Sequence, residues 1–168
     1  TNVTDVAGNV MAETTLPFSF ASAASYKDII LTEIFADPTP QVGLPDAEFV
    51  ELYNRSANPV DLAGWKFTDG SSTATLPTRI ILPGQYLILT SNANASLYNA
   101  FGNVLGAANF PTLNNAGEAL KVYAPGNQLI DSVNFNLSWY ADEDKQAGGW
   151  TLELIDVNNI CGEENNWT

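Results

Sequence analysis

Five acidic residues lie in one short stretch of the chain and could bind a cation through their oxygen atoms. They are Glu33, Asp37, Asp46, Glu48 and Glu51. Calcium takes about six to eight oxygen ligands from carboxylates and loop carbonyls, and a Pro-rich loop between Asp37 and Asp46 is stiff enough to fix such ligands. Asp37, Asp46 and Glu48 are therefore the calcium candidates, although no cofactor is required. The alternative is a set of solvated acids that protect strand edges from aggregation.

Paired carboxylates could also hydrolyse glycosides, with one group acting as an acid and the other as a base or nucleophile. Any acidic chain offers such pairs, so we expect no enzyme activity. A second acidic run, Asp142-Glu143-Asp144, is typical of a solvated loop, with a calcium-binding loop as the alternative.

Aromatic residues offer a different chemistry, because their rings can stack on a sugar. Trp65 and Trp150 lie in strand-like stretches, and we expect both to pack in the core. Trp139 and Tyr140 lie in a polar stretch and are the candidates for an exposed pair that binds a ligand, with Trp167 as a further member of such a platform. A carbohydrate-binding module is thus one open function.

The composition excludes several other chemistries. Nineteen acidic residues face 6 basic ones, for a net charge of −13, which disfavours nucleic acids and anionic membranes as partners. No His is present, so Ser-His-Asp catalysis and His-ligated zinc are excluded. The one Cys, Cys161, cannot form an internal disulfide, and we expect it to be buried. No apolar run is long enough to span a membrane.

The elements that must position these residues are short β-type runs separated by turns, a pattern typical of a sandwich or barrel. Only residues 95–101 look helical. The predicted strands cover residues 16–20, 29–35, 49–53, 65–68, 79–82, 85–90, 120–124, 129–135 and 150–155.

Three turns have clear sequence signals. The segments 82–85 and 124–127 each contain Pro-Gly, which suits a type II turn because Gly accepts a positive φ. Both are predicted to close hairpins, and Asp69-Gly70 marks another tight connection. In the predicted strand 48–54, Val50 and Leu52 should face the core, while Asn54 should bond to loop backbone, as should Asp61.

Six segments follow one another along the chain, at residues 29–34, 48–54, 60–65, 82–84, 110–118 and 130–133. This ordered series resembles the lamin tail domain, an immunoglobulin-like β-sandwich, and the likeness covers about residues 28–160. Two further segments, 37–46 and 148–153, resemble the bacterial branch of that family, which occurs in exported surface proteins.

The resemblance implies an all-β, antiparallel immunoglobulin-like sandwich over residues 28–168, with at most one short helix. Residues 1–20 are similar to the end of a preceding Ig-like module, and residues 21–27 are predicted to be a linker. We expect a non-catalytic interaction module of an exported, cell-surface or periplasmic bacterial protein, with a protein or surface polysaccharide as partner and no membrane insertion. The alternatives are a carbohydrate-binding module and a structural spacer stiffened by calcium.

Overall fold

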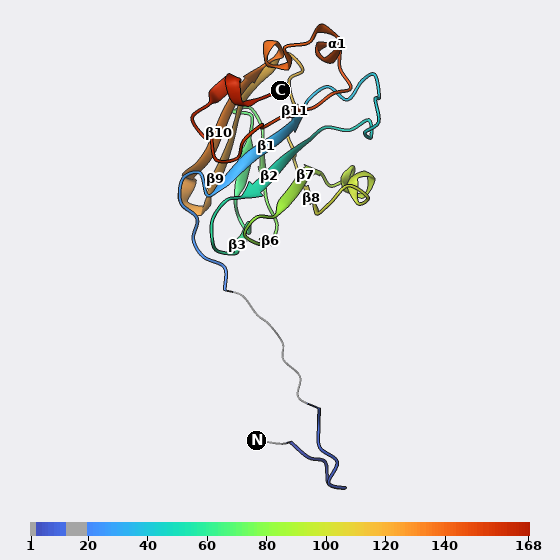
Figure 1. Cartoon of the computed structure of the whole chain (residues 1–168), viewed down its shortest axis with the longest axis vertical. Coiled ribbons are helices and arrows are strands. Elements are labelled where there is room, and N and C mark those ends of the chain that lie inside the picture. Colours follow the sequence, from blue (N-terminus) through green and yellow to red (C-terminus); the bar gives the residue numbers. More distant parts are fainter. Residues whose placement is uncertain (1–2, 13–19) are drawn as a thin grey trace.

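The computed structural model describes residues 3–12 and 20–168, and the second range folds into a β-sandwich (Figure 1). The described residues also contain one short α-helix and four 3-10 turns. The strands are β1 (Ile29–Phe35), β2 (Phe49–Asn54), β3 (Val60–Asp61), β4 (Lys66–Thr68), β5 (Thr73–Thr75), β6 (Ile80–Ile81), β7 (Tyr86–Ser91), β8 (Val104–Ala107), β9 (Gly117–Ala124), β10 (Gln128–Asn136) and β11 (Leu152–Glu153). The helical elements are η1 (Ala95–Tyr98), η2 (Pro125–Asn127), η3 (Leu137–Tyr140), α1 (Glu143–Gln146) and η4 (Glu163–Asn166).

Two sheets form the layers of the sandwich. One has the strand order β11-β1-β2-β7-β8, the other has the order β10-β9-β4-β5, and β3 pairs with β6 in a small third sheet. The predicted β-sandwich is confirmed. One departure is that β8 runs parallel to β7, because the chain passes through η1 and returns in the same direction.

The core lies between the two sheets and follows the predicted alternation. Val50 and Leu52 are fully buried, as is Trp65, whereas Glu51 on the same strand faces outward and is half-buried. A bulge between Leu31 and Glu33 shifts the register of β1, so that Leu31 and Ile34 both join the core.

The three predicted turns form, but the two strands that flank one of them do not pair with each other. Pro125-Gly126 closes the β9–β10 hairpin, with Gly126 at φ 80°, and Asp69-Gly70 closes the β4–β5 hairpin. The Pro83-Gly84 turn, however, joins β6 to β7 in separate sheets, so the hairpin prediction there is wrong. A turn signal fixes a chain reversal and leaves open which strands pair.

Two helical predictions also need correction. Residues 95–101 contain only the 3-10 turn η1, and Asn94 makes no side-chain cap. The α-helix lies instead in the acidic run that was predicted to be a loop. The Asp142 carboxylate accepts hydrogen bonds from the backbone of Asp144 and Lys145, which satisfies the first N–H groups of α1.

The N-terminal segments are described in part. Residues 3–12 form a turn in which the Asp5 carboxylate accepts hydrogen bonds from the Ala7 and Asn9 backbones. The predicted strand 16–20 lies outside the described residues except for Phe20. In the predicted linker, Ser22 donates a backbone hydrogen bond to Pro59 and Ala24 is buried in the core, so this stretch packs on the sandwich.

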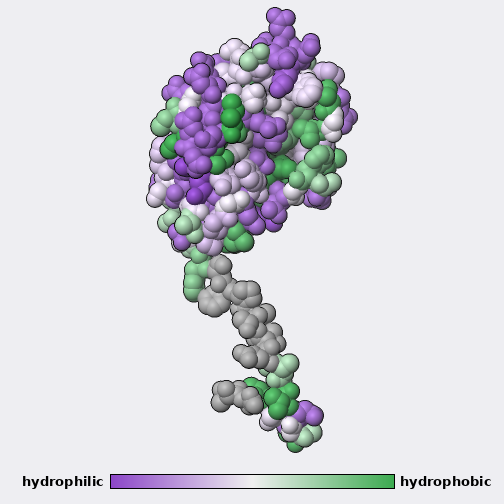
Figure 2. Space-filling model, viewed as in Figure 1, coloured by the Kyte–Doolittle hydropathy of each residue, from purple (hydrophilic) through white to green (hydrophobic). Residues whose placement is uncertain are grey.

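No helix within residues 3–12 and 20–168 has the length and apolar character needed to cross a membrane. On the face shown in Figure 2, hydrophobic residues form separate patches among hydrophilic ones.

Candidate functional site

A cavity of about 360 Å³ lies between β1 of one sheet and β10 of the other, with the C-terminal segment as a third wall. We call it the β1–β10 cavity. Ile30 and Leu31 line it from β1, Ser132 and Asn134 from β10, and Trp167 from the C-terminal segment. In Figure 1, this segment (red) lies beside β1 and β10.

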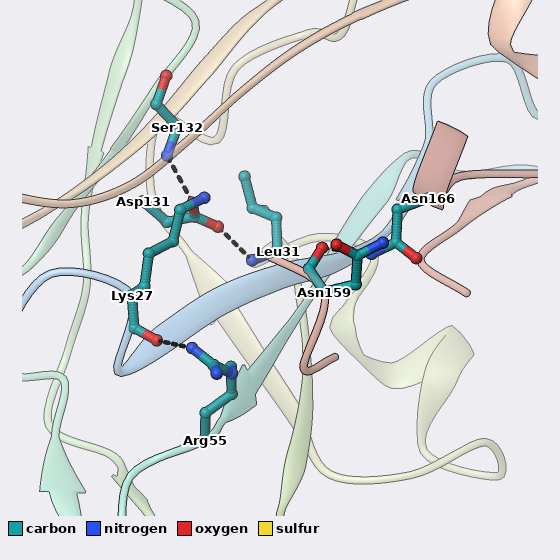
Figure 3. Close-up of polar contacts among 7 residues, drawn as sticks. All are labelled: Lys27, Leu31, Arg55, Asp131, Ser132, Asn159 and Asn166. Carbon is teal, nitrogen blue, oxygen red and sulfur yellow. Dashed lines mark hydrogen bonds and ion pairs between the residues drawn. The ribbon is translucent and has the colours of Figure 1, made fainter. Parts of the chain in front are cut away.

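A buried ion pair joins the two sheets at this cavity. The Lys27 side chain forms a salt bridge with Asp131, and their side chains are 15% and 1% exposed. The Asp131 carboxylate also accepts hydrogen bonds of 2.7 Å from the backbone N–H groups of Leu31 and Ser132 (Figure 3). Because Asp131 is bound on both oxygens, it positions the walls of the cavity and is not a free acid or base.

The backbone of Lys27 strengthens the same junction. Its N–H donates to the Ile130 carbonyl at 2.7 Å, and its carbonyl accepts a hydrogen bond of 3.0 Å from Arg55 (Figure 3). Lys27 has a φ of 65°, a left-handed conformation that costs a non-glycine residue free energy. Lys27, just before β1, is therefore joined to β10 and to Arg55, the residue that follows β2, through its backbone and its side chain.

The C-terminal wall is held by a buried amide. Asn166 is 3% exposed, and its side-chain nitrogen donates to the carbonyls of Asp156 and Asn159, both at 2.8 Å. Its side-chain oxygen accepts from the Asp156 backbone at 3.0 Å. These bonds fix the following Trp167 with its ring centroid 6.0 Å from that of Trp139.

The remaining lining includes uncharged polar groups that can bind a ligand. The side-chain amides of Asn134 and Asn159 line the cavity and have no hydrogen-bond partner within the described part of the chain. The hydroxyl of Ser132 and the rings of Trp139 and Trp167 complete a surface with both polar and aromatic character.

The predicted aromatic pair is only partly correct. Tyr140 is 4% exposed and donates its hydroxyl to the Trp150 carbonyl, so its assignment as an exposed ligand-binding residue is wrong. Trp139 is half-buried and lines the cavity beside Trp167. Trp150 is exposed although a core position was predicted, because it precedes a two-residue strand and lies outside the sheet.

Two of the three calcium candidates share Thr39 as a partner, and the third bonds elsewhere. The Thr39 backbone N–H donates to Asp37 and the Thr39 hydroxyl donates to Asp46, while Glu48 accepts from the Leu113 backbone. Burial raises the pKa of Glu48. No three Asp, Glu, His or Cys side chains in residues 3–12 and 20–168 form a group that could hold a metal. Calcium binding here stays a prediction that the arrangement of side chains does not support.

The other two residues of that acidic stretch belong to a different feature. Glu33 lies opposite Glu51 of β2 and opposite Glu153 of β11, so three glutamates cross the outer face of the sheet beside a hollow of about 140 Å³. Burial raises the pKa of Glu33 to about 7, with smaller increases from its two neighbours. Burial also raises the pKa of Glu51. We call these residues the glutamate row.

Sequence reasoning missed most of the cavity. Asp131 carried a usable signal, since it is a charged residue that directly follows Leu129 and Ile130 inside a predicted strand, and a buried group of this kind needs a partner. Lys27 gave no comparable signal, because its side-chain partner Asp131 is 104 positions away. Asn166 bonds to residues 7 and 10 positions away, but it lies in a polar stretch in which a buried amide resembles its exposed neighbours. Cys161, predicted to be buried, is exposed because it lies in the polar turn before η4.

Comparison with known families agrees with the fold. A family model described as the Lamin Tail Domain matches residues 22–136. No curated protein matches the chain.

Proposed function

Because the chain belongs to the lamin tail domain family, whose Ig-like modules are generally non-catalytic, we propose that it is an interaction module that binds its partner in the β1–β10 cavity. The observation that carries this proposal is the cavity itself. Its walls are fixed by Lys27, Asp131 and Asn166, while the amides of Asn134 and Asn159 are left without partners in the described residues. A rigid hollow with unused polar groups is typical of a binding site.

We place this module in an exported, cell-surface or periplasmic bacterial protein. The segments 37–46 and 148–153 support this setting through their resemblance to the bacterial branch. The partner is a protein or a surface polysaccharide. The net charge of −13 argues against nucleic acid, since phosphates would be repelled.

A sedimentation assay with washed bacterial cell envelopes tests the proposal. We expect the full chain to sediment with the envelopes in a saturable manner. The double variant N134A/N159A should lose most of this binding, because it removes two unused amides from the cavity without removing a hydrogen bond of the fold.

The matched control is N99A/N115A, which removes two exposed amides that do not line the cavity. This control should bind like the unchanged chain. Absence of saturable binding to envelopes, or equal binding by both double variants, would overturn the proposal.

A further inference from the structure

The β1–β10 cavity has the size of a site for a compact ligand. Its volume of about 360 Å³ lies near the lower end of the range of about 300–1,000 Å³ that is usual for small-molecule sites. A flat contact with a folded protein would not need such a hollow, because protein interfaces are typically broad surfaces.

Strand addition by a peptide is disfavoured at this place. β1 pairs with β2 on one side, and on the other side β11 pairs with Glu33 and Ile34, next to the cavity-lining Ile30 and Leu31. Toward the cavity, the Leu31 N–H is bonded to the Asp131 carboxylate, and the Ile130 carbonyl accepts from the Lys27 backbone. Since these backbone groups are occupied, an extended peptide finds few free partners there.

The charges of the lining favour an uncharged ligand. Among the described residues, Lys27 is the one cation in the lining, and its salt bridge to the buried Asp131 neutralises it. The remaining charged group is the exposed Glu163. A phosphate or carboxylate ligand would find no free cation here, and the net charge of −13 repels polyanions as they approach.

The uncharged groups match the chemistry of a sugar. The half-buried ring of Trp139 offers apolar surface for the C–H face of a pyranose, and the ring of Trp167, which is 7% exposed, supports it from behind. The amides of Asn134 and Asn159 can each donate and accept, as the hydroxyl of Ser132 can, and sugar hydroxyls require both kinds of partner. We propose that the β1–β10 cavity binds a neutral sugar residue of a surface glycan, an inference that rests on the proposed function and specifies its ligand.

Direct titration provides the first test. The ¹H–¹⁵N NMR spectrum of the full chain is recorded against neutral trisaccharides of glucose and of N-acetylglucosamine, with a trimer of galacturonic acid as the charged comparison. We expect saturable shifts at residues 131–134 with at least one neutral sugar, and none with the acidic trimer. The N134A/N159A variant should weaken binding about tenfold, because two hydrogen bonds to the ligand are lost.

Two further variants separate the cavity from other aromatic surfaces. W139F retains a ring and should keep more affinity than W139A, whose fold is checked by its spectrum. W150A removes an exposed ring that does not line the cavity, and it should bind sugar like the unchanged chain. Loss of sugar binding in W150A but not in N134A/N159A would overturn the inference.

Treated envelopes distinguish this inference from the proposed function. Periodate destroys vicinal diols of glycans, whereas protease removes proteins. If periodate abolishes sedimentation and protease does not, the neutral-glycan inference is supported. If protease abolishes it and periodate does not, the inference is overturned while the proposed interaction module stands. If untreated envelopes bind no protein, both fail.

Discussion

Two sets of acidic side chains lie beside strand β1 in very different surroundings. On the side facing β10, Asp131 is almost completely buried, but it has a cation and two backbone N–H groups as partners. On the outer face, the glutamate row crosses β11, β1 and β2 with hydroxyl partners, and no cation from the described part of the chain is in hydrogen-bond contact with it.

For a carboxylate in this protein, the partners that surround it matter more than the depth of its burial in deciding how well its charged form is tolerated. A buried carboxylate is tolerated when opposite charge and hydrogen bonds compensate for its lost hydration. Glu33 is less buried than Asp131 but faces two other glutamates, and its pKa rises to about 7 because its charged form is poorly solvated.

The geometry of β1 explains why the buried Asp131 and the glutamate row both lie beside this strand. The short β11 pairs with Glu33 and Ile34 and does not reach Leu31, so the Leu31 N–H is available to Asp131. The bulge between Leu31 and Glu33 also turns Thr32 toward Glu51, whose carboxylate accepts its hydroxyl at 2.8 Å. The irregular pairing of β1 thus makes the Leu31 N–H available to Asp131 and the Thr32 hydroxyl available to Glu51.

Removing the Asp131 carboxylate, whose charge is balanced by partners, should have the largest effect on stability. The variant D131A leaves the Lys27 ammonium and the Leu31 N–H without their partner, and we expect the free energy of unfolding to fall by about 3–5 kcal/mol in urea denaturation. D144A, which removes an exposed carboxylate, should change it by less than about 0.5 kcal/mol.

A paired replacement sharpens this test. K27M/D131L removes both charges together and should lose less stability than D131A, because no unpaired charge remains. A loss below about 1 kcal/mol in D131A would contradict the role assigned to this ion pair.

The uncharged part of the cavity wall should give an intermediate effect. In N166A, the carbonyls of Asp156 and Asn159 lose their donor, and we expect a loss of about 1–3 kcal/mol. Hydrogen exchange should become faster in residues 155–167 while the β2–β7 pair stays protected. Uniform acceleration across both sheets would show that the C-terminal wall is not a local unit.

On the outer face, the corresponding change should stabilise the protein. Glu33 has a raised folded pKa, so the stability that its protonated form provides is fully present below about pH 4.5 and is lost as the pH rises through about 7. E33Q cannot ionise, and at pH 8 it should be more stable than the unchanged chain by about 1 kcal/mol, allowing for solvent screening.

The difference between E33Q and the unchanged chain should disappear near pH 4.5. Urea denaturation at several pH values measures it, and E163Q at an exposed site serves as the control. Equal pH profiles for E33Q and E163Q would refute the raised pKa.

The sequence predicted the fold better than it predicted these sites, for a physical reason. Strand periodicity and turn residues are local signals, and β1 was predicted with the boundaries that it has. The short strands β3, β5 and β8 were missed because two to four residues show no clear period.

The sites depend on distant pairing, which leaves little local trace. Lys27 and Asp131 meet because β10 packs beside β1, and no spacing in the sequence reveals that. The acidic stretch was read as one cluster, but the fold divides it. Glu33 and Glu51 face each other across β1 and β2, whereas Asp37 and Asp46 bond to Thr39 in the loop.

The smallest expected effect comes from giving the glutamate row the cation that it lacks. Glu153 is exposed and lies directly opposite Glu33. In E153K, an ammonium would face the Glu33 carboxylate, and cross-strand pairs of opposite charge stabilise by about 0.2–1 kcal/mol. The gain should be seen at pH 8 and should shrink at pH 5, where Glu33 is protonated, and in 1 M salt.

E164K makes the same change in net charge at an exposed site outside the row, and it measures how much of the gain comes from reducing the overall negative charge. If E164K stabilised the chain as much as E153K, the row would owe its behaviour to the net charge of the protein and not to the alignment of three glutamates across β1.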